Sequence, residues 1–134
     1  MMNNRPVLHI PKTALEKWHD WISVLLLLAA MGYLAFVGPQ LPEIIPTHVN
    51  GSGDVNGWGN KWVLLLMPLL SIVLFIGFTV LSKFPHTFNY RQAITEENAF
   101  RQYRMGRLVL SWVKLFTVVL FTGIEWFMIQ LAFS

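Results

Sequence analysis

The chain has 134 residues, no cysteine and few charged side chains. The absence of cysteine excludes a disulfide framework, a zinc site built from thiolates and cysteine-based catalysis. Charged residues make up 13% of the chain and hydrophobic residues 54%. A soluble domain usually carries about 25% charged residues and less than about 50% apolar ones, and a disordered chain is still more polar. The composition therefore excludes both an ordinary soluble domain and a disordered protein.

Most of the hydrophobic residues lie in three blocks, each long enough for a membrane-spanning helix. The blocks cover residues 21–38, 62–81 and 108–133, and only the third contains charges, Lys114 and Glu125. A helix rises 1.5 Å per residue, so about 20 residues cross the roughly 30 Å core of a bilayer. The sequence predicts an all-α integral membrane protein with three transmembrane helices, which form one domain over the whole chain.

The first block follows basic residues, as the core of a secretory signal peptide does. Its apolar run is longer than the core of about 7–15 residues that is typical of signal peptides. The residues that follow it contain no small-x-small cleavage site. We therefore expect this block to remain in the protein as its first helix.

The ten basic residues are distributed unevenly between the connecting segments. Eight of them precede the first block or lie in the second connection, residues 82–107, and only Lys61 and Lys114 lie elsewhere. The positive-inside rule then places the N-terminus and the second connection in the cytoplasm. It places the first connection, residues 39–61, and the C-terminus outside. The net charge of +3 is thus explained by topology and not by nucleic-acid binding.

The first connection is long and rich in glycine, asparagine and aspartate, which are the residues of tight turns. We expect an ordered extracytoplasmic loop. The candidate binding residues of this loop are Pro46, His48, Asn50, Gly53, Asp54, Gly57, Trp58 and Lys61. His48 and Asp54 are also weak candidates for a divalent metal site, although their spacing fits no standard motif. The alternative is that the polar side chains only stabilise turns.

Two motifs together resemble the signature of a bacterial membrane family. The first comprises Pro46-Thr47-His48-Val49-Asn50, Gly53-Asp54 and Gly57-Trp58-Gly59-Asn60-Lys61, with Val49 where the family usually has an aromatic residue. The second, in the cytoplasmic connection, includes Asn89, Tyr90, Glu96, Glu97, Asn98, Arg101 and Arg104. The chain is similar in this respect to domain-of-unknown-function family 1648, which includes the SdpI-like immunity proteins, and resembles a short three-helix member of it.

The resemblance implies a protein of the bacterial cytoplasmic membrane without enzymatic activity or a cofactor. SdpI-like proteins protect their producer from a secreted peptide toxin, so the resemblance implies a binding or sensing role in toxin immunity or cell-envelope stress. The partners would be the lipid bilayer, a peptide toxin or another membrane protein, and a second copy in a homodimer. Two alternatives stay open. One is an accessory subunit of a larger complex such as a transporter, and the other is a metal-dependent enzyme using His48, Asp54 and Glu125.

The third block contains the two charges that are costly inside a membrane. Lys114 lies about 9 Å into the predicted helix, and we expect its long side chain to snorkel to the cytoplasmic headgroups. Glu125 is a functional candidate because an intramembrane carboxylate is expensive. The two residues share one helix face, which we expect to face other helices. We also consider a contact between Glu125 and His48 or Lys61.

The segments near the cytoplasmic ends of the helices carry the remaining expectations. Thr95 is a candidate N-cap, and a long helix is expected from Glu96 to near the C-terminus. The arginines in its first turns either contact anionic lipid or a partner, or only set the topology. His9 and His19 are expected at the surface.

Overall fold

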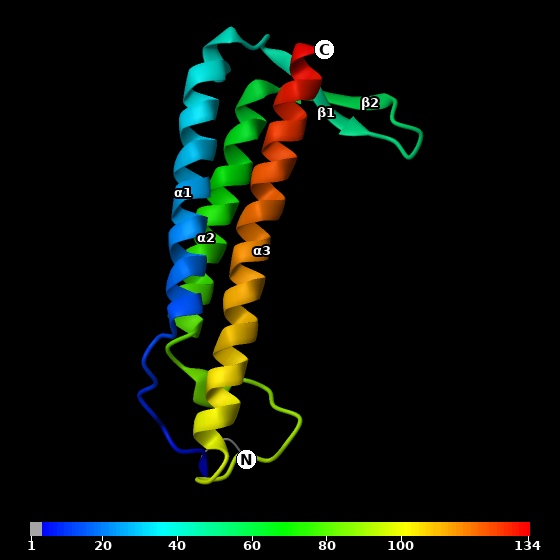
Figure 1. Cartoon of the computed structure of the whole chain (residues 1–134). Coiled ribbons are helices and arrows are strands. Elements are labelled where there is room, and N and C mark those ends of the chain that lie inside the picture. Colours follow the sequence, from blue (N-terminus) through cyan, green and yellow to red (C-terminus); the bar gives the residue numbers. More distant parts are fainter. Residues whose placement is uncertain (1–3) are drawn as a thin grey trace.

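The computed structural model describes residues 4–134 as three helices that run side by side, with a small hairpin at one end (Figure 1). The helices are α1 (Ala14–Val37), α2 (Leu66–Leu81) and α3 (Ala99–Phe133). With adjoining short helical turns they form three stretches, each long and apolar enough to cross a membrane. The three expected transmembrane helices are thus confirmed. The N-terminal segment and the hairpin lie at opposite ends of the bundle, here called the N-terminal end and the hairpin end (Figure 1).

Helix α1 begins before its apolar block because a capping box starts it at Thr13. The Thr13 hydroxyl accepts a hydrogen bond from the backbone N–H of Glu16, and the Glu16 carboxylate accepts one from the backbone N–H of Thr13. These bonds satisfy two backbone donors that a helix N-terminus otherwise leaves free. The first turns of α1 therefore carry polar side chains into the bundle.

Helix α2 is preceded by a 3-10 turn, η3 (Lys61–Leu65), so the expected second helix is divided into two parts. Asn60 starts the turn by accepting a hydrogen bond from the backbone N–H of Trp62. Pro68 has no N–H to offer the carbonyl of Leu64, which removes one α-helical hydrogen bond at this point. The tighter turn ends and the α-helix begins where that bond is missing.

Helix α3 has 35 residues and is about 52 Å long at 1.5 Å per residue. It begins at Ala99, three residues after the expected start at Glu96 and nine before the apolar block, so one long helix runs to near the C-terminus as predicted. Its first turns project beyond the bilayer core at the N-terminal end. Thr95 is not its N-cap, which corrects the sequence prediction. Thr95 and Asn98 instead exchange side chain–backbone hydrogen bonds in the turn that precedes the helix, and Asn98 is the N-cap.

The connection between α1 and α2 contains a two-stranded antiparallel hairpin that the sequence analysis did not predict. A 3-10 turn, η2 (Gly38–Gln40), leads into β1 (Ile44–Val49), which pairs with β2 (Val55–Asn60). The fold is therefore mostly helical with one small sheet. Ile45 is fully buried at the base of the hairpin and fixes it to the helices, whereas the tip projects away from them (Figure 1).

Helix α3 is the central element, because it packs along both α1 and α2 while those two contact each other little. At the hairpin end the core consists of Leu34, Val37, Leu41, Ile45, Leu64 and Ile129. At the N-terminal end a smaller core of Ile10, Ala99 and Tyr103 joins the N-terminal segment to the base of α3. Between these ends, large apolar side chains such as Leu28, Val73 and Phe116 are exposed. Such a surface is expected for helices that face lipid.

Candidate functional site

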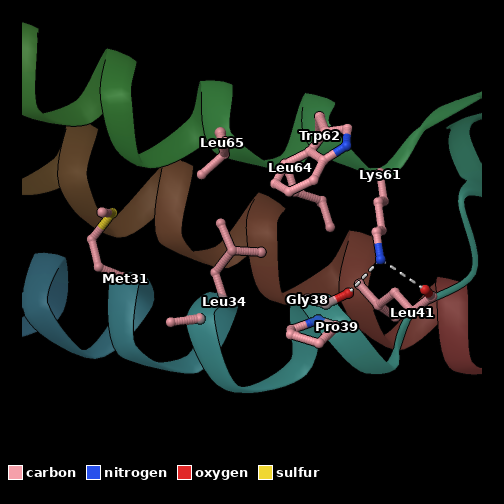
Figure 2. A pocket seen from close by; sticks show the side chains of 10 residues that line it. Met31, Leu34, Gly38, Pro39, Leu41, Lys61, Trp62, Leu64 and Leu65 are labelled. Carbon is pink, nitrogen blue, oxygen red and sulfur yellow. Dashed lines mark hydrogen bonds between the residues drawn. The ribbon is translucent and has the colours of Figure 1, made fainter.

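An apolar groove lies between the end of α1 with η2 and the turn η3 at the hairpin end of the bundle (Figure 2). Its volume is about 430 Å³, within the range of about 300–1,000 Å³ that is typical of small-molecule sites. The lining residues are Met31, Leu34, Ala35, Gly38, Pro39, Leu41, Lys61, Trp62, Leu64 and Leu65. The end of α1 and η2 form one side of the groove, and η3 forms the other. Its lining is apolar except for one cation.

That cation is Lys61, which lies at the end of the groove nearest the hairpin (Figure 2). Its ammonium group donates hydrogen bonds to the carbonyl oxygens of Gly38 and Leu41, at 2.9 and 3.1 Å. The Glu43 carboxylate, mostly exposed, lies 3.9 Å away. An ammonium group has three donors, so one remains for a ligand oxygen. The site can therefore hold an apolar chain along the helices and an anionic or carbonyl oxygen at its end.

The candidate residues at the hairpin tip build a turn. The Asn50 side chain accepts hydrogen bonds from the backbone N–H groups of Ser52 and Asp54 and from the Ser52 hydroxyl. Gly53 has φ of +89°, a conformation that only glycine adopts without strain. Asp54 is exposed and contributes its backbone to the turn. Asn50, Gly53 and Asp54 thus have an architectural role.

The candidate residues along the strands face one another across the hairpin. Pro46 is buried and pairs with Trp58, whose side chain is 63% exposed. His48 pairs with Gly57, and a methyl group at Gly57 would lie 2.7 Å from the Cβ atom of His48. The exposed His48 ring makes a hydrogen bond of 3.0 Å with the Asn56 side chain. Among residues 4–134, no three His, Cys, Asp or Glu side chains are placed to hold a metal ion.

A network of polar side chains joins all three helices toward the N-terminal end. The Lys114 ammonium on α3 lies 2.5 Å from a carboxylate oxygen of Asp20 on α1 and donates a hydrogen bond to the Thr79 hydroxyl on α2. Lys12 binds the other oxygen of Asp20 at 2.7 Å. Lys114 is almost fully buried and also lies over the ring of Phe75. Its side chain therefore points between the helices, which corrects the expectation that it snorkels to the headgroups.

Two further polar contacts join α1 to α3 beside this network. Arg107 is buried, forms an ion pair of 3.1 Å with Glu16 and donates a hydrogen bond to the carbonyl oxygen of Ile10. His19 is also buried, and its ring makes a hydrogen bond of 2.7 Å with the Ser111 hydroxyl. The expectation that His19 lies at the surface is therefore wrong. Together these contacts fix the register of α1 against α3.

Glu125 faces the interior of the bundle, as its helix face predicted, and is 2% exposed. One of its carboxyl oxygens, Oε1, is buried and has no hydrogen-bond partner among residues 4–134. In the same part of the chain, no hydrogen bond or ion pair joins Glu125 to His48 or Lys61, both of which have other partners. The structure therefore does not form the contact considered from the sequence.

Some residues of the motif in the second connection pack against neighbouring side chains, and the others are exposed to solvent. Tyr90 stacks against Phe88 and Tyr103, lies under the Arg5 guanidinium and donates a hydrogen bond to the carbonyl oxygen of Pro85. Burial raises the pKa of Tyr90 to about 12, so its hydroxyl stays protonated at neutral pH. Asn98 stabilises the turn before α3. The remaining members, Asn89, Glu96, Glu97, Arg101 and Arg104, are exposed.

Sequence reasoning missed the partners of the interhelical network, above all Asp20 and Glu16. A signal was present in the spacing of the polar residues. At the start of α1, Glu16, His19, Asp20 and Ser23 occupy positions i, i+3, i+4 and i+7 of one helix face. On α3, Arg107, Ser111 and Lys114 recur every three or four residues. Two matched polar stripes on neighbouring helices indicate an interface.

Residues 25–72 match the model of the family described as Domain of unknown function (DUF1648). The match begins within α1, contains the whole hairpin and ends in the first half of α2. No curated protein and no solved structure matches the chain. The resemblance expected from the hairpin motif is thus confirmed. The match shows a similarity to this family over residues 25–72, the segment that contains the hairpin.

Proposed function

We propose that the chain is a non-enzymatic protein of the bacterial cytoplasmic membrane that binds an amphiphilic peptide in the groove between α1 and η3. The observation that carries this proposal is positional. All ten residues that line the groove lie within residues 25–72, the segment that matches the DUF1648 family. We therefore expect a ligand of the matched segment to bind in the groove that this segment forms.

The chemistry of the groove favours a membrane-active peptide as the ligand. The lining takes apolar side chains, and the free donor of Lys61 takes a carbonyl or carboxylate oxygen of the peptide. Trp58 and Trp62 are exposed near the same end, where aromatic side chains lie at a membrane–water interface. A protein that sequesters such a peptide would serve toxin immunity or envelope-stress sensing, the roles of SdpI-like proteins.

The peptide-binding proposal is tested by filling the groove. Ala35 is exposed and lines the groove, so Ala35→Trp should obstruct it, whereas Ala29→Trp places the same bulk on an exposed part of α1 outside the groove. Both variants and the native chain are produced in bacteria that are sensitive to a membrane-active toxic peptide, and survival is measured. We expect protection by the native chain and by Ala29→Trp, and loss of protection by Ala35→Trp.

Two outcomes would count against this function. Equal protection by both variants would remove the groove from the mechanism, and no protection by the native chain would refute immunity to that peptide. Co-purification of a stable stoichiometric membrane complex from native membranes would instead support the accessory-subunit alternative.

The proposed topology places the N-terminal end in the cytoplasm and the hairpin outside. Because the chain has no cysteine, single introduced cysteines report their side of the membrane without background. Ser52→Cys at the hairpin tip should react with a membrane-impermeant thiol reagent in intact cells. Asn89→Cys should react only after the cells are permeabilised, and the reverse pattern would overturn the topology.

A further inference from the structure

A second cavity, of about 390 Å³, lies at the N-terminal end of the bundle, far from the groove. Its charged lining residues are all cationic: Lys12 before α1, Lys83 after α2 and Arg107 on α3, with His9 beside them. No carboxylate lines it. Three segments of the chain thus bring positive charge to one cavity, which favours an anionic ligand.

Part of this positive charge is not neutralised by the protein. Lys12 pairs with Asp20 and Arg107 with Glu16, and both carboxylates line a neighbouring space between the three helices. Lys83 is exposed, and its ammonium group makes no hydrogen bond or ion pair with the part of the chain that the structure describes. The cavity therefore has an excess of positive charge.

Arg107 supplies an independent indication that an acceptor belongs here. Its side chain is 8% exposed and two of its nitrogens are bonded, to Ile10 and Glu16. Its Nε atom is buried and has no partner among residues 4–134. A buried donor without an acceptor is unfavourable, and Arg107 lines the cavity, so negative charge in the cavity would stabilise its guanidinium.

The position of the cavity favours a lipid headgroup as the anionic ligand. It lies where α2 has just ended and α1 is about to begin, with the exposed Trp18 and Trp21 in the first two turns of α1. This is the level of the lipid headgroups. The rest of the lining includes apolar side chains such as Leu8 and Ile10, which suit the part of a lipid next to its phosphate.

We propose that this basic cavity binds the headgroup phosphate of an anionic phospholipid. The site is separate from the peptide groove and does not depend on the proposed function. It also gives Lys83 and Arg107 a role beyond topology. The exposed Arg101 and Arg104 are not part of it.

The experiment compares two charge-matched variants of the full chain in lipid nanodiscs. Lys83→Gln removes the cation that has no protein partner, and Lys17→Gln removes an exposed cation on α1 outside the cavity. Thermal stability and lipid retention by native mass spectrometry are measured in phosphatidylcholine, with and without phosphatidylglycerol. We expect phosphatidylglycerol to be retained and to stabilise the native chain and Lys17→Gln. In Lys83→Gln its affinity should fall roughly tenfold, the effect of losing one charge-assisted hydrogen bond.

Three results would overturn the proposal. Equal loss in both variants would indicate nonspecific attraction to a charged membrane. Equal retention of phosphatidylcholine would show that the negative charge is not recognised. The third would be stabilisation in detergent by inorganic phosphate to the same extent and with the same dependence on Lys83, which would assign the site to a soluble anion.

Discussion

Replacement of Asp20 by asparagine should destabilise the protein more than replacement of its partner Lys114 by methionine. Lys114 is the more deeply buried partner, with 6% of its side chain exposed against 21% for Asp20. Without the Asp20 charge, Lys114 keeps only the Thr79 hydroxyl and the face of the Phe75 ring. Without Lys114, Asp20 still pairs with Lys12 at 2.7 Å. The ion pair is thus asymmetric, and the cost of breaking it depends on which partner is left.

The expected magnitudes follow from this asymmetry. Removal of one partner from a buried ion pair costs about 3–5 kcal/mol, because the other charge is left uncompensated. Asp20→Asn keeps an acceptor oxygen, so we expect about 3 kcal/mol. Lys114→Met replaces the ammonium by an apolar group of similar length, and we expect about 1 kcal/mol. The double variant leaves only Lys12 without its partner, and 43% of that side chain is exposed to solvent. It should therefore be more stable than Asp20→Asn alone, by about 2 kcal/mol.

These values are measured by equilibrium unfolding in detergent micelles, followed by circular dichroism. Lys17→Met serves as the control, because it removes an exposed charge on α1 that has no ion-pair partner within residues 4–134, and its free energy of unfolding should stay within about 0.5 kcal/mol. A larger loss for Lys114→Met than for Asp20→Asn would refute the reasoning. Additive losses in the double variant would show that the two charges do not interact.

Three further predictions concern single sites. Gly57→Ala would place a methyl group 2.7 Å from His48, so the hairpin should be cleaved faster by protease, whereas Gly51→Ala, with open space around it, should not change the cleavage rate. Glu125→Gln replaces a carboxyl group, one oxygen of which has no partner among residues 4–134, by a neutral amide of similar size. The melting temperature should therefore not fall, and the rate of hairpin cleavage should be unchanged. Faster cleavage would show that Glu125 is coupled to the hairpin. Thr13→Ala removes the capping box of α1 and should lower the free energy of unfolding by about 1 kcal/mol, and no loss would show that the cap is dispensable.

The helices were predictable because long apolar runs are read directly from the sequence. Their C-terminal ends, expected at residues 38, 81 and 133, agree with the structure to within one residue. The starts depend on capping: Thr13 moved the start of α1 seven residues before the apolar block, and the turn at Thr95 and Asn98 places the start of α3 at Ala99, three residues after the expected Glu96. The polar first turn of α3 is stable outside the bilayer because Tyr103 packs in a small core with the N-terminal segment.

The hairpin was not predicted because its strands are short and atypical. β2 contains the motif Asn56-Gly57-Trp58-Gly59-Asn60, with two glycines and two asparagines. Glycine and asparagine are depleted in strands. Here the glycines are required because the side chains of β1 lie against them, as His48 does at Gly57. The hairpin depends on the close approach of its two strands, and the residue pattern of either strand alone does not show this contact.

The contacts that fix the register of the helices lie at the end of the bundle opposite to the groove. The polar contacts that fix helix register involve Glu16, Asp20, Thr79, Arg107 and Lys114, and all of these residues lie outside residues 25–72. The groove at the other end is lined by side chains that make no ion pair except for Lys61. The register of the helices is therefore fixed outside the matched segment, whereas the groove shares Leu34, Leu41 and Leu64 with the core at the hairpin end. Substitution of these three residues should cost stability, so only the other lining residues can change without loss of the fold.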